Sequence, residues 1–274
     1  MLKANYHTHT KYCNHAGGLA SDYAESAIKN GFNVLGMSDH APLPLPLKQP
    51  SDITFRNMYI EEFLDGYLVD AYNAKEKYKD KLTMYVGVET EYIKAYHKHY
   101  EFLRSKLDYM ILGIHFFYIG DKRINTYGEI NKSNIMEYAK VACEAMNTGL
   151  YDYFAHPDLF FIQYKNEDGN IVWDELCDKA SRIMIECAIK NNVYLEINAN
   201  GPNNSRRFGY SEDFNWLYPT SHFWSIVKEY PEAKCIIGSD AHNPDSLVTS
   251  DTPKIIEFVN KLGIKVEDYL KDYK

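Results

Sequence analysis

The chain has 274 residues, of which 45% are hydrophobic and 25% are charged, as is usual for a globular protein with a sizeable core. Its formal net charge of -8 disfavours a non-specific nucleic-acid binder, which normally carries a basic face. The sequence shows no signal peptide, no run near the roughly 18 apolar residues of a membrane span and no C-x-x-C pair among its cysteines, so we expect a cytoplasmic protein without disulfides.

Seven short apolar runs predict β-strands, because each is rich in β-branched, aromatic or aliphatic residues and is bounded by turn or charged residues. In chain order they are Leu2–His7, Asn33–Ser38, Thr83–Glu89, Tyr109–Ile114, Tyr151–Ala155, Val193–Asn198 and Lys234–Gly238. Most lack strict alternation of apolar and polar residues, which is typical of strands that are buried on both faces of a parallel sheet.

Segments with helical spacing lie between these strands and after the last one. They are Asp22–Asn30, Ile60–Tyr78, Ser133–Asn147, Asp174–Lys190, Ser221–Glu229 and Pro253–Lys261. Strand alternating with helix predicts a parallel sheet, and seven repeats favour a single α/β domain over residues 1–274, a closed or nearly closed TIM-like barrel. The proline-rich Ala41–Pro50 is predicted to be a long loop at the carboxyl end of the second strand, in preference to a polyproline ligand.

Histidines and carboxylates concentrate at the carboxyl ends of the predicted strands, where seven of the ten histidines lie. The residues are His7, His9, His15, Asp39, His40, Glu89, His115, His156, Asp158, Asp240 and His242, with Glu196 on the sixth strand. The carboxyl ends of barrel strands converge on one face, so these side chains are expected to meet. Imidazole and carboxylate suit zinc, iron or manganese, and the ligands are numerous enough for two or three ions.

A purely structural role for these histidines is the alternative interpretation. A single histidine on an apolar strand is usually a hydrogen-bonded core residue, and one H-x-H motif is a weak signal. Recurrence at the ends of successive strands is hard to reconcile with that role, because buried polar groups without partners are penalised. His7 and His9 are also two apart on one strand, so both side chains point the same way and can bind one ion.

The motifs H-T-H-T, C-N-H-A, S-D-H-A-P, G-V-E-T-E-Y, G-I-H-F, A-H-P-D and G-S-D-A-H follow one another between His7 and His242. In this set the chain resembles the PHP (polymerase and histidinol phosphatase) superfamily, and within it the PHP-type histidinol-phosphatases. The resemblance implies a distorted (β/α)7 barrel. It also implies hydrolysis of L-histidinol phosphate to L-histidinol and phosphate in histidine biosynthesis.

The resemblance further implies three adjoining metal positions. The first ion would be held by His7, His9, Glu89 and Asp240. Glu89 would bridge to a second ion that is also held by His115 and His156, and the third would be held by His15, His40 and His242. Metal ions lower the pKa of bound water toward about 7 and neutralise phosphoryl oxygens, so we expect a hydroxide that bridges the first two ions to attack phosphorus.

Other polar residues are candidates for supporting roles. Asp39 and Asp158 would protonate the leaving alkoxide or orient histidine ligands, with the orienting role favoured. In a loop after the sixth strand, Arg206 and Arg207 would bind phosphate or form a surface pair. Two weaker candidates are Lys165, as a further phosphate ligand, and Glu91, which like Asp158 would accept from the amino or imidazole group of the substrate.

Two other functions stay open at this point. In the first, the chain is a PHP phosphoesterase for another substrate, either a small phosphate ester such as a nucleotide or, as a 3′–5′ exonuclease, a polynucleotide. In the second, it is a non-catalytic metal-binding scaffold. The acidic balance disfavours the exonuclease, and a complete ligand set argues against the scaffold. We therefore expect a small-molecule phosphate ester as the partner, with neither nucleic acid nor membrane.

Overall fold

The computed structural model describes residues 2–44 and 57–270. Within these residues, a parallel sheet of seven strands runs in the order β1-β2-β3-β4-β7-β8-β9. Its strands are β1 (Ala4–Asn5), β2 (Val34–Met37), β3 (Thr83–Thr90), β4 (Tyr109–Leu112), β7 (Tyr153–Phe154), β8 (Tyr194–Asn198) and β9 (Cys235–Gly238). All the predicted strands are therefore present, although all except the third are shorter than predicted, the first and fifth most of all.

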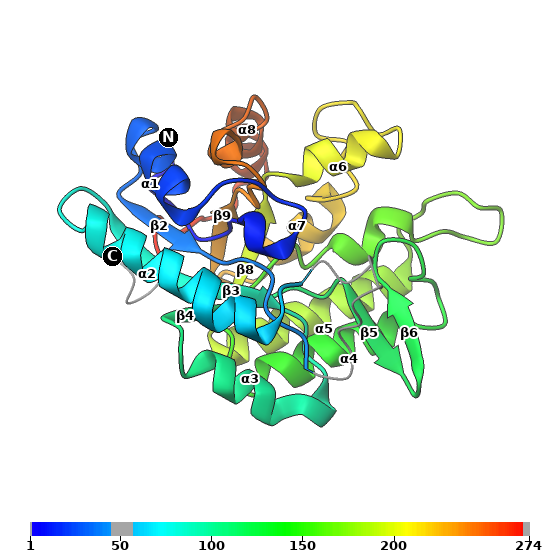
Figure 1. The fold of residues 1–274 in the computed structure, drawn as a ribbon. Coiled ribbons are helices and arrows are strands. Elements are labelled where there is room, and N and C mark those ends of the chain that lie inside the picture. The colour runs from blue at the N-terminus through cyan, green and yellow to red at the C-terminus, as the bar shows by residue number, and fades with distance from the viewer. Residues whose placement is uncertain (1, 45–56, 271–274) are drawn as a thin grey trace.

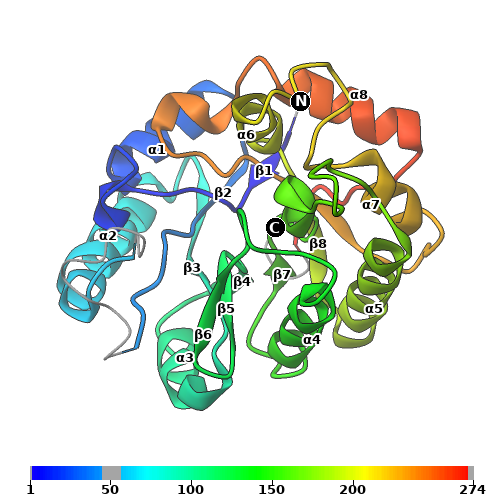
Figure 2. The same cartoon turned by 90° about the vertical axis from the view of Figure 1, so that its right-hand side faces the viewer.

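Helices surround the sheet, with the strands in the middle (Figure 1, Figure 2). They are α1 (Ala20–Lys29), α2 (Leu68–Tyr78), α3 (His97–Arg104), α4 (Ile135–Met146), α5 (Glu175–Asn191), α6 (Gly201–Arg207), α7 (Ser221–Val227) and α8 (Thr252–Leu262). A π-helical turn (Glu62–Tyr67) precedes α2, and 3-10 turns lie at Lys11–Cys13, Lys94–Tyr96, Leu159–Gln163 and Pro244–Leu247. The apolar faces of the helices and the outer face of the sheet share one large buried cluster, which confirms the predicted barrel of alternating strands and helices.

The gap between the first and last strands of the barrel is nearly closed, by contacts at each end of the strands. At the carboxyl end of the strands, Thr8 and Ala241 form a parallel bridge. At the opposite end, the segment after α8 fills the gap: Val266 forms a bridge with Cys235 of β9, and Lys3 forms an ion pair of 2.6 Å with Asp268. Both ends of β1 are thereby held beside β9.

Leu270 inserts into the amino end of the barrel, where it packs in a buried cluster with Tyr6, Tyr109 and Tyr153. Its side chain is 1% exposed. Leu270→Ala is therefore expected to lower the free energy of unfolding by about 2–5 kcal/mol, because it removes buried methyl groups and leaves a cavity. Urea denaturation measures this change, with Leu64→Ala, at a side chain that is 36% exposed, as the control. Equal losses of stability in the two variants would contradict the proposed contribution of Leu270 to the core at the amino end of the barrel.

The structure contains elements beyond the predicted strands and helices, including α3 between β3 and β4. A hairpin of β5 (Phe116–Ile119) and β6 (Lys122–Asn125) projects from the barrel, and α6 occupies the segment that was predicted to be a loop. Of the predicted loop Ala41–Pro50, residues 45–50 lie outside the described residues. Within residues 2–44 and 57–270, no helix has both the length and the apolar character needed to cross a membrane.

Candidate metal centre

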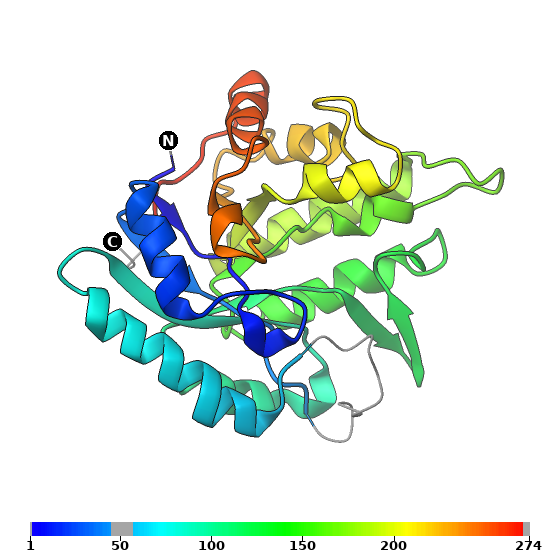
Figure 3. The same ribbon diagram turned by 45° about the horizontal axis from the view of Figure 1, so that its top comes forward.

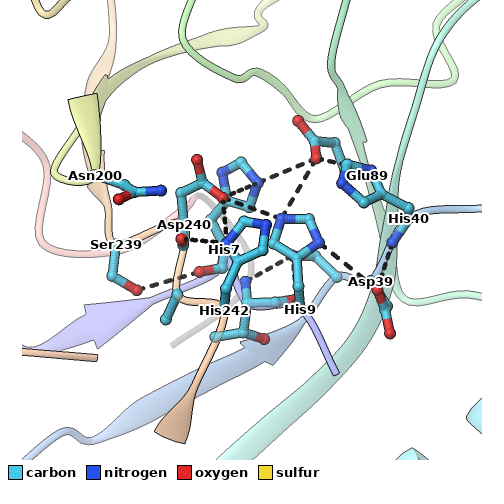
Figure 4. A network of polar contacts seen from close by, with 12 residues as sticks. His7, His9, Asp39, His40, Glu89, Asn200, Ser239, Asp240 and His242 are labelled. Atoms are coloured by element: carbon cyan, nitrogen blue, oxygen red, sulfur yellow. Dashed lines mark hydrogen bonds and ion pairs between the residues drawn. The ribbon is translucent and has the colours of Figure 1, made fainter. Parts of the chain in front are cut away.

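The predicted ligands converge at the carboxyl ends of the strands, as Figure 4 shows for those on β1, β2, β3 and β9. His7 and His9 follow β1, Glu89 lies in β3 and Asp240 follows β9. All four of these side chains are buried. Burying so many groups that can carry charge would be unfavourable without compensation, so their convergence points to a bound cation.

One group of ligand atoms surrounds a common point between β1, β3 and β9. The Nε2 atom of His9 lies 3.1 Å from Asp240 Oδ1 and 3.5 Å from Glu89 Oε2, and His7 Nε2 lies 3.4 Å from the same Glu89 oxygen. Ligand atoms of a tetrahedral site with metal–ligand bonds of about 2.0–2.1 Å are expected roughly 3.3 Å apart. His7 Nε2, His9 Nε2 and Glu89 Oε2 are buried and have no hydrogen-bond partner among the described residues, so this group fits a divalent metal ion.

A second group uses the other oxygen of the same carboxylate. Glu89 Oε1 lies 3.0 Å from His156 Nε2 and 3.5 Å from His115 Nε2. The two oxygens of Glu89 thus face different imidazoles, with His115 and His156 at Oε1 and the first group at Oε2. A carboxylate in this position is suited to bridge two metal ions.

The remaining three predicted ligands lie beside the first group. His15 and His242 place their Nε2 atoms 3.1 Å apart, and the rings of His15 and His40 have centroids 5.1 Å apart. His40 Nδ1 is also 3.3 Å from Glu89 Oε2. The structure therefore brings all nine predicted ligands into one cluster.

Buried carboxylates hold the imidazoles from behind. Glu196 Oε1 lies 2.7 Å from His7 Nδ1, and Glu91 Oε1 lies 3.0 Å from His115 Nδ1. Such contacts select the ring tautomer and leave Nε2 free to bind a metal. Glu196 Oε2 also accepts a hydrogen bond of 3.1 Å from the backbone N–H of His156, so one carboxylate supports two ligands.

Asp39 plays a similar part between β1 and β2. It accepts a hydrogen bond of 2.8 Å from the backbone N–H of His40 and another of 3.0 Å from that of Thr10, and its Oδ1 atom lies 3.6 Å from His9 Nδ1 (Figure 4). The side chain is buried and does not line the cavity in front of the cluster. This placement supports the orienting role predicted for Asp39 over the alternative role of proton donor.

The electrostatics of the cluster favour cations. Burial opposes the charge on Glu89, yet the imidazoles of His115 and His7 hold the pKa of this carboxyl well below its usual range. Burial also opposes charge on His9, but Asp240 and Asp39 raise the pKa of His9 to about 9. Burial, together with the neighbouring His9 ring, holds the pKa of His40 well below its usual range. The carboxylates are thus ionised, and protons on the imidazoles would give way to a divalent ion.

Two ligands sit on strained backbone, and two glycines make room for carboxylates. His156 and Asp240 have φ angles of 34° and 47°, in the left-handed region that residues other than glycine seldom occupy. Such strain clusters at functional sites. A Cβ atom at Gly113 would collide with the Glu89 carboxylate, and one at Gly238 would collide with that of Glu196. The glycines before His115 and Asp240 are therefore required by the cluster.

A cavity of about 930 Å³ opens in front of the cluster. Glu91, Arg206 and Arg207 line it, as a substrate-binding role requires. Arg206, however, is engaged in a bidentate ion pair with Asp251, with N–O distances of 3.1 and 2.6 Å. Arg207 is exposed at the end of α6.

Two further predicted substrate-binding or catalytic residues do not line the cavity. Asp158 is buried away from the cavity and accepts a hydrogen bond of 2.6 Å from the backbone N–H of Thr220, and burial raises the pKa of Asp158 to about 7. Lys165 is exposed and does not line the cavity, because its segment turns away to form an antiparallel bridge with Ile171. Neither placement supports the predicted contact with substrate.

The cavity also has a wall that sequence reasoning missed. This wall is formed by the β5–β6 hairpin and the segment just after it. Its lining residues are Phe116, Arg123, Asn125 and Tyr127, none of which was predicted to belong to the site. The available signal was the apolar run Phe116–Ile119 followed by Gly120-Asp121, a pattern typical of a tight hairpin.

Known proteins with similar sequences and folds identify the family. The histidinol-phosphatase of Bacillus subtilis is 30% identical over 121 residues, which cover 42% of this chain and 45% of that protein. The chain spans about half the length of the curated relatives it matches, between 37% and 59%.

Two solved structures share the fold. The hisK protein of Listeria monocytogenes has a TM-score of 0.73 at 19% identity, with 92% of this chain and 99% of that chain covered. The histidinol phosphate phosphatase of Lactococcus lactis, solved with zinc, L-histidinol and phosphate, has a TM-score of 0.70 at 18% identity, with 96% and 95% covered. Residues 5–200 match the PHP domain family. The chain therefore belongs to the PHP domain family.

Proposed function

We propose that this chain is a metal-dependent phosphomonoesterase that hydrolyses L-histidinol phosphate to L-histidinol and phosphate. The observation that carries the proposal is the Glu89 carboxylate, whose two oxygens face separate sets of imidazoles, three at Oε2 and two at Oε1. Paired metal sites that share a carboxylate are typical of hydrolases acting on phosphate esters. The histidinol-phosphatase of Bacillus subtilis and the zinc, histidinol and phosphate in the Lactococcus lactis structure support the choice of substrate.

The residues fit two or three divalent ions of zinc, iron or manganese. We assign the ligands as the family resemblance implies, with Glu89 shared between the first two positions. Bound divalent ions would neutralise phosphoryl oxygens and lower the pKa of water, which a phosphate monoester needs because its own charge repels hydroxide. The protein's part is to hold the imidazoles at fixed angles through Glu196, Glu91 and Asp39.

Every carboxylate that lines the described part of the cavity already faces a basic side chain. Glu89 and Asp240 face imidazoles of the cluster, Glu91 faces His115 and Asp251 faces Arg206. Each of these carboxylates is therefore already engaged, and none in the described part of the cavity is placed as a free proton donor. Asp39 and Asp158 lie outside the cavity, so we leave protonation of the leaving alkoxide to water in the open cavity. We assign Asp39 an orienting role because it contacts His9 and His40, whereas Asp158 accepts from the backbone N–H of Thr220 and is assigned no role at the cluster.

Arg207 is proposed to bind the phosphate, because Arg206 is already paired. Arg207→Gln is expected to lower kcat/KM by about tenfold or more, mainly through KM, since a charge-assisted contact to phosphate is lost. Steady-state phosphate release measures this. In Arg206→Gln the ion pair with Asp251 is lost, so a lower melting temperature is expected with a smaller change in KM. The reverse order of KM effects would assign the phosphate to Arg206.

One experiment separates the candidate functions. The purified protein, supplemented with manganese or zinc, is assayed for phosphate release from L-histidinol phosphate, nucleotides and p-nitrophenyl phosphate. A kcat/KM that is higher for histidinol phosphate by orders of magnitude is expected. Comparable values for the other esters would remove the histidinol assignment, and no turnover of any ester would remove the enzyme assignment and leave a metal-binding scaffold.

The same proposal extends to the organisation of the chain. We treat residues 1–274 as one phosphoesterase domain, since the ligands come from both its first and its last strands. The free state of the five cysteines supports a reducing compartment such as the cytoplasm.

A further inference from the structure

The β5–β6 hairpin forms the wall of the cavity next to the second group of ligands. It begins directly after His115, and its far end returns to the same residue, because the backbone N–H of Thr126 donates a hydrogen bond of 2.9 Å to the carbonyl of His115. The hairpin and α6 project from the same end of the barrel (Figure 1, Figure 3). Both contribute residues to the one cavity in front of Glu89.

Tyr127 is placed by this return so that its ring lies parallel to a metal-ligand candidate. The planes of Tyr127 and His115 differ by 5°, with ring centroids 6.0 Å apart. The side chain lines the cavity and is 37% exposed. A flat aromatic surface is thus fixed beside the place where the phosphate ester must bind.

Tyr127 and Phe208 are the exposed aromatic residues that line the described part of the cavity, and of the two only Tyr127 is stacked on a residue of the ligand cluster. On the hairpin, the Phe116 ring is covered by the Arg123 guanidinium, which lies 5.6 Å from the ring centroid. The wall formed by α6 presents the amides of Asn203 and Asn204, together with Arg207. Polar groups there suit the phosphate, whereas a planar group in the alcohol part gains most by stacking on Tyr127.

We propose that Tyr127 is a specificity-determining residue that stacks against a planar ring in the alcohol part of the substrate. The proposal rests on the proposed phosphomonoesterase function and adds what selects the alcohol. For L-histidinol phosphate, the ring is the imidazole. An ester without a ring gains nothing from this contact, so the loss of Tyr127 must affect the two kinds of ester differently.

The test compares kcat/KM for three esters with the manganese-loaded protein: L-histidinol phosphate, phenyl phosphate and glycerol 1-phosphate. Tyr127→Leu is expected to lower kcat/KM about tenfold for the two esters that contain a ring, mainly through KM, and less than about twofold for glycerol 1-phosphate. Tyr127→Phe keeps the ring and is expected to restore values near those of the unchanged protein. Phe208→Leu is the matched control, because Phe208 is an exposed aromatic residue on the other wall of the cavity.

Several outcomes would overturn the proposal. Equal losses for all three esters, accompanied by a lower manganese content, would show that Tyr127 only positions His115. Unchanged kinetics in Tyr127→Leu, or a larger ring-dependent loss in Phe208→Leu, would place the ring elsewhere. If the unchanged protein hydrolyses phenyl phosphate but not histidinol phosphate, the histidinol assignment fails while the phenyl and glycerol esters still decide the role of Tyr127. If no ester is hydrolysed, both proposals fall.

Discussion

Glu89→Gln is expected to lower kcat/KM for phosphate-ester hydrolysis by about three orders of magnitude or more. The Glu89 carboxylate faces His7 and His9 through one oxygen and His115 and His156 through the other. Replacing one oxygen by an amide NH2 group removes a ligand from one position and abolishes the negative charge that both positions share. Two metal ions are therefore affected by a change of one atom.

Steady-state kinetics and the metal content measured by inductively coupled plasma mass spectrometry test this prediction together. Glu91→Gln is the matched control, because Glu91 lies two residues further along the chain and contacts only one imidazole of the cluster, His115. We expect that variant to lose about 10-fold to 100-fold in metal affinity or activity, as is usual when the partner of a ligand is removed. Near-normal metal content and activity in Glu89→Gln would rule out the bridging assignment.

Removal of bound metal by chelation is expected to abolish turnover, with recovery on addition of manganese or zinc. Without divalent ions the phosphate dianion would face the carboxylates of Glu89 and Asp240, and nothing would supply hydroxide at neutral pH. We expect the rate to fall by at least about three orders of magnitude, measured as phosphate release after dialysis against a chelator.

We expect the barrel to stay folded after the metal ions are removed, because its large apolar core contains none of the predicted ligands. Far-ultraviolet circular dichroism of the chelated protein is therefore expected to be unchanged, which separates loss of metal from unfolding. Full activity in protein shown to be free of metal would contradict the proposed mechanism. Loss of both activity and secondary structure would show instead that the metal ions hold the barrel together.

The fold and the convergence of the predicted ligands on one face were largely predictable from the sequence. Buried parallel strands leave apolar runs such as Thr83–Glu89, and the helices between them leave periodic segments such as Asp174–Lys190, so the barrel follows from local patterns. The position of a residue at the carboxyl end of such a strand then determines which face of the barrel it occupies. His7, Glu89 and Asp240 meet for this reason although they are far apart along the chain.

The roles of the supporting residues were not predictable, because they depend on contacts that leave no local pattern. Nothing in the segment around Arg206 indicates that its guanidinium forms an ion pair with Asp251, 45 residues away. Likewise, Asp158 lies two residues after the predicted ligand His156, yet its carboxylate turns toward Thr220.

The sequence by itself determined the kind of site: a multinuclear His and carboxylate cluster at one end of a parallel barrel. Only the tertiary structure decided how each side chain is used within it. It turned the two oxygens of Glu89 toward different imidazoles, took Asp39 and Asp158 out of the cavity and placed Tyr127 in its wall. The physical reason is that strand position sets which face a residue occupies, whereas the direction of its polar atoms is set by partners elsewhere in the chain.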